Sequence, residues 1–335
     1  MQSFHFGRQG EIDSLERRTH DDPTPGKGEV LVRLHASSLN YRDIMILEGR
    51  YGRVPFIPGL VPLSDAAGEV VAVGEGVSRF RPGDRVVATA LPRWQAGKIS
   101  PDVLIDQPGA NRPGVLATLK VVHEDGLVAL PAPLSFEEAA TLPGAAVTAW
   151  VAVQHVRPGE TVLVQGTGGV ALFALLFARS AGARVLAITS SDEKAERLKE
   201  LGADQVVNYT QQPEWHLAAR EATGGRGVDH VIEIGGSGTL ERSIQVAAMG
   251  GRIELIGTLA AGGSFDPSAF SRNIVTIRWA SVGSRADFEA MNRAITVHRL
   301  RPAVDQVFAF AQAREAYCHF KGRSHFGKVV IRHDG

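Results

Sequence analysis

The stretch VLVQGTGGVA places closely spaced glycines between an apolar run and a predicted helix. Gly166, Gly168 and Ala171 have the spacing G-x-G-x-x-A. In such a loop the first glycine permits a tight turn, the second lets the backbone approach a pyrophosphate, and the small third residue lets helix and strand pack closely. The N–H groups of Gly169 and Val170 at the helix start would face the phosphates. The pattern therefore predicts a dinucleotide site, and a purely structural glycine-rich turn is the alternative.

The residues after the next predicted strand, RVLAIT, indicate which dinucleotide binds. A site for NAD usually has an acidic residue there, about 20 residues after the glycines, which binds the ribose 2′-hydroxyl. This chain has Ser190 and Ser191 at that point and Lys194 one turn later. Hydroxyl groups and a cation suit a 2′-phosphate, so we expect NADP(H) as the cofactor. Two alternatives stay open: Asp192 and Glu193 could lie near the ribose, and Lys194 could be a solvated helix residue.

Two different patterns of elements position these residues. Residues 1 to about 125 alternate short strand-like runs such as GEVLVRLHASSL with turns, which predicts a mostly antiparallel or barrel-like β domain. From about residue 135, strands alternate with helices, which predicts an α/β fold with a doubly wound parallel sheet. Gly235 and Gly257 end two of those strands, at the edge where an open α/β sheet binds its ligand. The tail from about residue 284 adds two helices and two strands.

Composition excludes several classes of protein. The 36 basic and 36 acidic residues give a formal net charge of zero, and Lys and Arg form no long run, which argues against binding to nucleic acid or to a membrane surface. No apolar stretch is long enough to cross a bilayer, and the first residues have no signal-peptide pattern. The single cysteine, Cys318, agrees with a reducing compartment, so we expect a cytoplasmic protein.

Seven motifs together resemble one family. The chain is similar to the medium-chain dehydrogenase/reductase superfamily, in its zinc-free quinone-oxidoreductase-like or alcohol-dehydrogenase-like branch. The resemblance implies a GroES-like catalytic domain at 1–125 that is completed by 284–335, a Rossmann NADP-binding domain at 126–283, and a homodimer through the edge strand near Ile277–Val282. The motifs are SSLNYRDIMILEGRY, VPLSDAAGEVVAVGEGVSRFRPGDRV, EEAATLPGAAVTAW, VLVQGTGGVA, SSDEKAERLKELGAD, GGRGVDHVIEIGG and HFGKVVI.

The zinc motifs of the superfamily are missing. Zinc-bearing members carry a cysteine ligand shortly before the position of Asp43, a Gly-His-Glu around position 59 and a lobe with four cysteines. This chain reads LNYRD and PGLVPLSD in the first two regions, and its PRWQAGKISPDV region has no cysteine. Because zinc sites need convergent thiolate and imidazole ligands, we expect no metal at the active site.

The resemblance also implies the catalytic residues. It places Asn40 and Asp43 beside the nicotinamide end of the cofactor and Tyr51 toward the substrate. A phenol is a suitable proton or hydrogen-bond donor to a developing oxyanion. The alternatives are that Tyr51 is a surface-loop aromatic residue and that Asp43 forms a structural ion pair with a neighbouring arginine.

Further cofactor contacts are implied by matching positions. Thr148 matches a threonine near the nicotinamide, and Tyr209 resembles a tyrosine that packs at the adenosine phosphate. Phe326, Gly327 and Lys328 match a tail segment that returns to the cofactor. The full predicted cofactor set is Thr148, Gly166, Gly168, Gly169, Val170, Ser190, Ser191, Lys194, Tyr209, Gly235, Gly257, Phe326, Gly327 and Lys328.

These observations predict an NADPH-dependent oxidoreductase that transfers hydride to a quinone, an enone or an aldehyde without zinc. A zinc-free alcohol dehydrogenase or an enoyl-thioester reductase is the alternative within the same class of enzyme. A nucleotide-binding redox sensor without turnover is the alternative from another class, since intact cofactor motifs fit both. The expected partner is a small-molecule substrate, and the sequence does not name it.

Overall fold

The computed structural model describes residues 1–52, 54–257, 259 and 268–333. The chain divides into two compact units, of which unit 1 is Met1–Val147 with Val282–Gly335 and unit 2 is Thr148–Ser281. The family resemblance implies domain boundaries at 125/126 and 283/284. Residues 126–147 belong to unit 1 because their strand and helix complete its sheet and pack on it, as described below.

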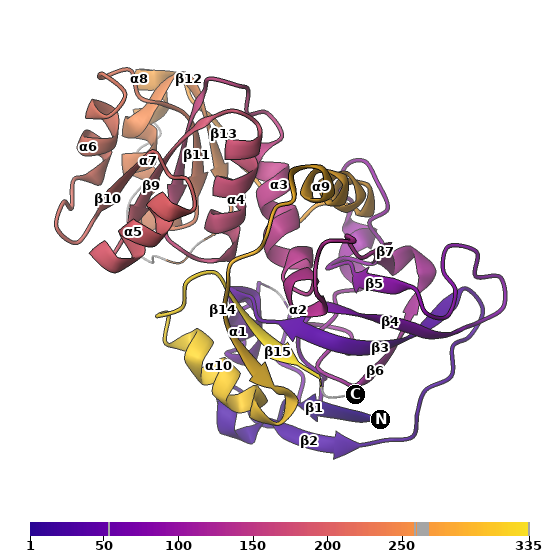
Figure 1. Ribbon diagram of the computed structural model, residues 1–335. Coiled ribbons are helices and arrows are strands. Elements are labelled where there is room, and N and C mark those ends of the chain that lie inside the picture. Colours follow the sequence, from indigo (N-terminus) through magenta and orange to yellow (C-terminus); the bar gives the residue numbers. More distant parts are fainter. Residues whose placement is uncertain (53, 258, 260–267, 334–335) are drawn as a thin grey trace. The chain divides into compact units, whose positions relative to one another are not determined.

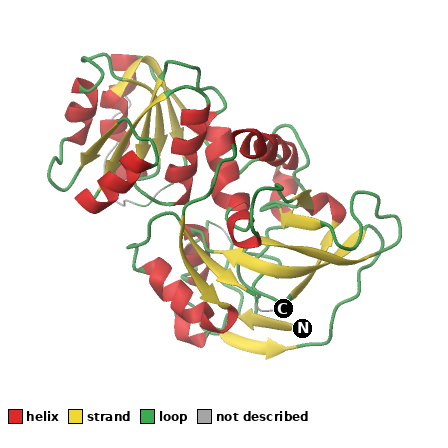
Figure 2. Ribbon diagram, in the orientation of Figure 1, coloured by secondary structure: helices red, strands yellow, loops and turns green. Residues whose placement is uncertain are grey.

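The strands described in unit 2 are drawn as arrows in Figures 1 and 2. They form one parallel sheet in the order β10-β9-β8-β11-β12-β13. The order runs outward in both directions from β8 and β11, so the sheet is doubly wound as predicted. The strands are β8 (Thr161–Gln165), β9 (Arg184–Thr189), β10 (Gln205–Asn208), β11 (Val228–Glu233), β12 (Ala247–Leu255) and β13 (Thr276–Trp279).

Helices of unit 2 cover this sheet. The longest, α4, has an almost wholly apolar sequence because it packs on the buried strands β8 and β9, while α5 packs on β9 and β10. Another helix, α6, packs on α7, which lies against β11 and β12. The helices are α3 (Val147–Val153), α4 (Gly169–Ser180), α5 (Asp192–Glu200), α6 (Trp215–Glu221), α7 (Leu240–Val246) and α8 (Ala269–Asn273), with a 3-10 turn at Gly236–Gly238.

Unit 1 is built on a mainly antiparallel sheet in the order β14-β15-β3-β4-β5-β7, with β6 paired to β3 and with a separate β1–β2 pair. Only the β14–β15 pairing in this sheet is parallel. The strands are β1 (Gln2–His5), β2 (Glu16–Thr19), β3 (Glu29–Ser38), β4 (Asp65–Val73), β5 (Arg85–Ala88), β6 (Leu119–His123), β7 (Leu127–Ala129), β14 (Val304–Ala309) and β15 (Lys328–Arg332).

The helices of unit 1 come from both ends of the chain. Short helix α2 packs on β3 and β4, which explains why residues 126–147 belong to this unit. The helices are α1 (Tyr41–Leu47), α2 (Phe136–Ala139), α9 (Arg285–His298) and α10 (Ala313–Lys321). Tighter and wider turns complete the unit: 3-10 turns at Ile12–Ser14, Pro101–Ile105, Glu124–Gly126 and Phe310–Gln312, and a π-helical turn at Leu142–Ala146.

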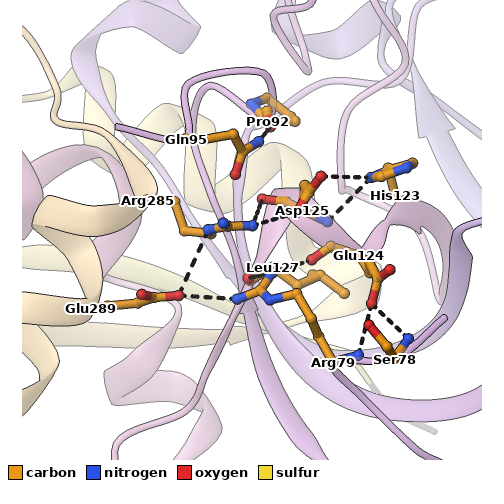
Figure 3. A network of polar contacts seen from close by, with 10 residues as sticks. All are labelled: Ser78, Arg79, Pro92, Gln95, His123, Glu124, Asp125, Leu127, Arg285 and Glu289. Carbon is orange, nitrogen blue, oxygen red and sulfur yellow. Dashed lines mark hydrogen bonds and ion pairs between the residues drawn. The ribbon is translucent and has the colours of Figure 1, made fainter. Parts of the chain in front are cut away.

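A polar network fixes α9 where the chain re-enters unit 1 (Figure 3). Arg79 donates to the Glu124 carbonyl at 2.6 Å and to the Glu289 carboxylate at 3.0 Å. Arg285, at the start of α9, donates to the carboxylate of Asp125. Because these residues come from the N-terminal and C-terminal parts of the chain, the network joins the two segments that make up unit 1.

Candidate functional site

The glycine loop between β8 and α4 has the geometry that the sequence predicts. Gly166 has φ +78°, a left-handed conformation that favours glycine, and its N–H donates to the Ile188 carbonyl at 2.8 Å. Gly168 has φ −77° and ψ 173°, which any residue can adopt. A Cβ placed on Gly168 would meet no described atom within 4 Å. Nothing in the described part of the chain therefore requires glycine at 168, and the space that a Cβ would fill suits an approaching pyrophosphate.

Free backbone donors line that space. The first bond within helix α4 runs from the N–H of Leu172 to the carbonyl of Gly168 at 3.1 Å. The N–H groups of Gly169, Val170 and Ala171 come before it and have no acceptor inside the helix. They lie at the positive end of the helix dipole and directly after β8, where the strand order reverses. A dinucleotide phosphate fits these groups.

A buried polar cluster that the sequence patterns did not reveal holds the neighbouring strand ends together. Glu233, at the end of β11, is fully buried. Its carboxylate accepts from the Gln165 amide at 2.8 Å, the Thr239 hydroxyl at 2.6 Å and the Gly236 N–H at 2.9 Å. The Gln165 amide oxygen in turn accepts from the Gly235 N–H at 3.3 Å. The only signal in the sequence is a polar residue that directly follows an apolar run at the end of each of the two strands.

Two other glycines of the predicted cofactor set, Gly235 and Gly257, are required by close packing within the fold. A Cβ on Gly235 would lie 2.2 Å from the Thr239 hydroxyl oxygen, and one on Gly257 would lie 2.3 Å from the Ile234 carbonyl oxygen. The backbone after β11 thus approaches Gly257 too closely for a side chain, and Thr239 does the same at Gly235. Unlike Gly168, these positions need glycine whether or not a ligand binds.

The end of β9 shows how the predicted ribose site is built. Ser190 is exposed directly after the strand, and the hydroxyl of Ser191 accepts from the Lys194 N–H at 3.3 Å. The carboxylate of Asp192 accepts from the side-chain amides of Asn208 and Gln211, each at 2.8 Å, and these bonds hold its pKa below the ordinary value. The acid that could have served an NAD ribose is therefore held by two neighbouring amides.

Tyr209 follows the adjacent strand β10. Its N–H donates to the Thr189 carbonyl at 2.9 Å, and its side chain is 40% exposed. Thr148, at the start of unit 2, is buried within α3. Their roles toward the cofactor stay predictions.

In unit 1, strand register brings Lys328 opposite Asn40. Val330 of β15 pairs with Ser38 of β3 in an antiparallel ladder, so the residue two positions before Val330 faces the residue two positions after Ser38. The Lys328 ammonium donates to the Asn40 Oδ1 atom at 2.6 Å and to the Leu39 carbonyl at 2.5 Å. Lys328 is only 2% exposed, so this contact is shielded from water.

Two buried carboxylates complete the same cluster. Asp43, in the first turn of α1, accepts from the Asn40 N–H at 2.8 Å, and burial raises the pKa of Asp43 to about 6. Asp65, which opens β4, accepts from the Ser64 hydroxyl at 2.6 Å and from the Gly144 N–H at 2.7 Å. Asp65 and Gly144 are members of the site that the sequence analysis missed.

Gly144 shows how tightly these groups pack. A Cβ on this residue would lie 2.8 Å from the Asn40 Nδ2 atom and 2.9 Å from the Asp65 Oδ2 atom. The Nδ2 atom of Asn40 is buried and has no hydrogen-bond partner among the described residues. The amide nitrogen of Asn40 is therefore a hydrogen-bond donor in a fixed orientation that no described residue uses.

Tyr51 and the tail residues are placed as follows. The ring of Tyr51 packs partly buried against the core of unit 1, with the Arg42 guanidinium 5.1 Å from its centre. The N–H of Phe326 donates to Asp305 at 2.9 Å, and Gly327 has φ +94° next to the Ala303 carbonyl. The structure thus gathers Asn40, Asp43 and Lys328, and it places Tyr51 beside Arg42, the residue before Asp43. The catalytic and cofactor roles themselves stay predictions.

Comparisons with known proteins agree with this architecture. The family model described as alcohol dehydrogenase GroES-like domain matches residues 26–132, and the one described as zinc-binding dehydrogenase matches residues 169–296. A zinc-type alcohol dehydrogenase-like protein of Schizosaccharomyces pombe is 42% identical over 335 residues, which cover 96% of this chain and 96% of that protein. The chain belongs to the medium-chain dehydrogenase/reductase superfamily.

Other members of the superfamily show its range. A quinone oxidoreductase of Pseudomonas aeruginosa is 29% identical over 98% of each chain. A solved structure of an NAD-dependent alcohol dehydrogenase superimposes with a TM-score of 0.91 at 34% identity, over 99% of each chain. This medium-chain dehydrogenase/reductase is accordingly an oxidoreductase that uses NAD(P)(H), as the sequence motifs indicate. None of its described helices is long and apolar enough to span a bilayer.

The donor set around Asn40 does not fit the zinc that the family description names. The region offers an amide, two carboxylates and an ammonium, and the Lys328 ammonium already binds the Asn40 oxygen. Both Asp65 oxygens accept hydrogen bonds from within unit 1. In the described parts of the chain, no three His, Cys, Asp or Glu side chains gather as metal ligands would. We therefore derive no step of the reaction through zinc.

Proposed function

We propose that this protein is an NADPH-dependent reductase that transfers hydride to a quinone, an enone or an aldehyde without a catalytic zinc. The observation that carries the proposal is the buried cluster of Asn40, Asp43, Asp65 and Lys328, because it offers hydrogen-bond donors instead of soft metal ligands. A carbonyl oxygen that gains negative charge needs either a metal or donors aimed at it. This cluster suits stabilisation of the oxygen by hydrogen-bond donors.

The preference for NADPH rests on the end of β9. Ser190 and Ser191 stand where an NAD site has its acid, and Asp192 is held by Asn208 and Gln211. Lys194, on the first turn of α5, supplies a positive charge near the same point. One solved structure of similar fold is named an NAD-dependent alcohol dehydrogenase and another is a quinone oxidoreductase complexed with NADPH, so proteins of this fold differ in the cofactor they use.

The residues divide the work in the proposed reaction. When bound, the nicotinamide supplies the hydride. Gly168 and the first N–H groups of α4 hold the pyrophosphate, and the Asn40 amide and the Tyr51 hydroxyl donate hydrogen bonds to the carbonyl oxygen. Tyr51 gives up the proton that completes the reduction. Asp43 holds the Asn40 backbone at the start of α1, so its buried carboxylate positions the amide.

A substrate panel tests the proposal directly. Quinones, enones, aldehydes and alcohols would each be mixed with the protein and with NADPH or NADH, or with NADP⁺ or NAD⁺ for the alcohols, and nicotinamide absorbance followed. We expect reduction of at least one carbonyl class, faster with NADPH, and no loss of rate after exhaustive treatment with a chelator. Loss of activity to the chelator with recovery on adding zinc would contradict the metal-free proposal. Tight NADPH binding with no turnover across the panel would favour a redox sensor instead.

A further inference from the structure

Lys328 is an unusual residue to find in the interior of a protein. Its side chain is 2% exposed, and removing an ammonium from water costs several kcal/mol unless partners replace the water. The partners here are the Leu39 carbonyl, the Asn40 Oδ1 atom and the nearby carboxylates of Asp65 and Asp43. Burial lowers the pKa of Lys328, while the two carboxylates oppose that change and favour its charged form.

An ammonium group fixes which way a neighbouring amide points. Lysine can only donate hydrogen bonds, so the Asn40 atom that faces it has to be the oxygen. The Nδ2 atom, which can only donate, is thereby turned to the other side of the amide plane. In the structure that Nδ2 atom is buried and unpartnered among the described residues. Without Lys328 the amide could rotate and present its oxygen instead.

This orientation matters for the proposed reaction, on which the inference rests. A substrate carbonyl oxygen, or the oxyanion that develops from it, accepts hydrogen bonds and is repelled by another oxygen. Only the Nδ2 end of Asn40 can stabilise it. We propose that Lys328 is a positioning residue that acts through Asn40: it holds Oδ1 toward the ammonium, which keeps the buried, unpartnered Nδ2 as the only end of the amide left to donate to the reacting oxygen.

The same geometry separates this role from a direct contact with the cofactor. The ammonium donates to two acceptors that both belong to unit 1, and the pairing of Lys328 with Val304 of β14 fixes its backbone. The Lys328 N–H donates to the Ala303 carbonyl at 3.0 Å. Removing the side-chain charge should therefore change turnover and leave cofactor affinity nearly unaltered.

A double-mutant cycle tests the proposal. The variants are Lys328→Met, Asn40→Leu and the double variant, assayed on the best substrate of the panel. We expect each single variant to lose about tenfold or more in kcat, on the scale of one lost transition-state donor, with less than about a twofold change in NADPH Kd. In the Asn40→Leu background, Lys328→Met should cost less than about twofold more. Losses that multiply, or a large rise in NADPH Kd, would overturn the proposal.

Two further variants control for simple damage to the fold. Lys120→Met removes another lysine of unit 1, whose ammonium donates to the Pro113 carbonyl at 2.6 Å, and it should leave kcat unchanged. Lys328→Arg keeps the charge and the donors and should recover part of the lost kcat. If Lys328→Met does not fold, Lys328→Arg still decides, because full retention of kcat supports a donor role and a loss as large as that of Asn40→Leu opposes it.

A measurement without substrate separates this inference from the proposed function. With ¹⁵N-asparagine labelling, the side-chain amide signals of Asn40 are those missing in Asn40→Leu. We expect them to shift in Lys328→Met and to stay in place in Lys120→Met. An unchanged Asn40 signal in Lys328→Met would overturn the inference even if the protein reduces carbonyls, while absence of turnover with a shifted signal would count against the proposed function alone.

Discussion

Some candidate site residues are explained by their contacts within the fold, and others only by a role in the reaction. Asp43 and Asp65 are buried carboxylates, and each is held by backbone N–H groups, from Asn40 and from Gly144 respectively. Both oxygens of Asp65 accept hydrogen bonds, while the Oδ1 atom of Asp43 is buried without a partner among the described residues. Tyr51 is different, because the described residues give its hydroxyl no hydrogen bond that would explain a phenol instead of a phenyl ring. The role of that hydroxyl is therefore best sought in the reaction.

Replacing Tyr51 by phenylalanine keeps the ring under the Arg42 guanidinium and removes only the donor. Because the hydroxyl would stabilise charge that develops in the transition state, we expect kcat to fall by about tenfold or more while NADPH Kd stays the same. Steady-state kinetics and a fluorescence titration with NADPH would measure the two quantities. An unchanged kcat would remove Tyr51 from the mechanism and point to water as the proton source.

Lys194 carries the prediction on cofactor choice. Lys194→Ala removes a cation near the ribose site, so NADPH binding should weaken by roughly 1.5–3 kcal/mol, the range for a hydrogen bond to a charged group, and NADH binding should hardly change. Isothermal titration with both cofactors measures this. Lys199→Ala, on the same helix and paired with Glu196, is the matched control and should alter neither affinity. Equal affinities for NADPH and NADH in the parent protein would contradict the premise.

The helices and strands place these residues, and most of the candidate site residues lie at the ends of helices and strands. Gly168 precedes α4, Gln165 and Glu233 end β8 and β11, and Lys328 opens β15. At strand and helix ends the backbone has unpaired donors and acceptors, so side chains and ligands bind there.

Gly168→Ala tests whether the start of α4 is shaped by a ligand. The added methyl meets no described atom within 4 Å and the backbone angles suit alanine, so the melting temperature without cofactor should stay the same or rise slightly. The methyl would occupy the pyrophosphate space, so we expect NADPH Kd to rise at least tenfold. Gly322→Ala, after α10, should alter neither quantity. A Gly168→Ala protein with normal NADPH affinity would count against the phosphate site.

The sequence predicted the elements of unit 2 better than the polar contacts within unit 1. Periodicity and glycine spacing depend on residues close in the chain, so β8, α4 and β9 could be read directly. Asp65 was missed because its partner Gly144 lies 79 positions away, and the contact exists only once β4 and the π-helical turn meet. For the same reason, residues 126–147 reveal their place in unit 1 only by packing on β3, β4 and β5.

At the scale of the whole molecule, a buried histidine makes the stability of the fold depend on pH. His333 lies just after β15, with its ring nitrogens on the Ser37 hydroxyl and the Ala117 carbonyl, each at 2.9 Å. Burial lowers the pKa of His333 from 6.5 to about 4. Since the folded pKa is below the unfolded one, this contribution to stability is complete above pH 6.5 and is lost as the pH falls toward 4.

His333→Gln can keep both hydrogen bonds without titrating. A shift of that size corresponds to roughly 3 kcal/mol, so the free energy of unfolding of the parent protein should fall by up to that amount more than that of His333→Gln between pH 7 and pH 4. Urea unfolding at several pH values measures the difference. Asp43, with its raised pKa, has the opposite sign in the same range, and comparing variants cancels it. Parallel pH curves for the two proteins would contradict the assignment.

The quaternary structure is also a whole-molecule proposal. Strand β13 ends the order of the parallel sheet in unit 2, and its Trp279 is 59% exposed. We propose that two copies pair along this edge into a homodimer. Sedimentation should show a dimer for the parent protein and a monomer for Trp279→Glu, with Val297→Glu, an exposed apolar position on α9, as the control that stays dimeric. A monomeric parent protein would refute the proposal.

The pairing of β15 with β3 also has a consequence for how the protein is made. β3 is translated before unit 2, but the strand that pairs with Ala36, Ser37 and Ser38 is translated only after unit 2. Until then the backbone of that stretch lacks its β15 partner, and an unpaired strand edge invites association with other chains. Unit 2 is complete well before unit 1 can close. Nascent chains from which unit 2 has emerged but β15 has not should thus be the species that chaperones bind most, with unit 2 already folded.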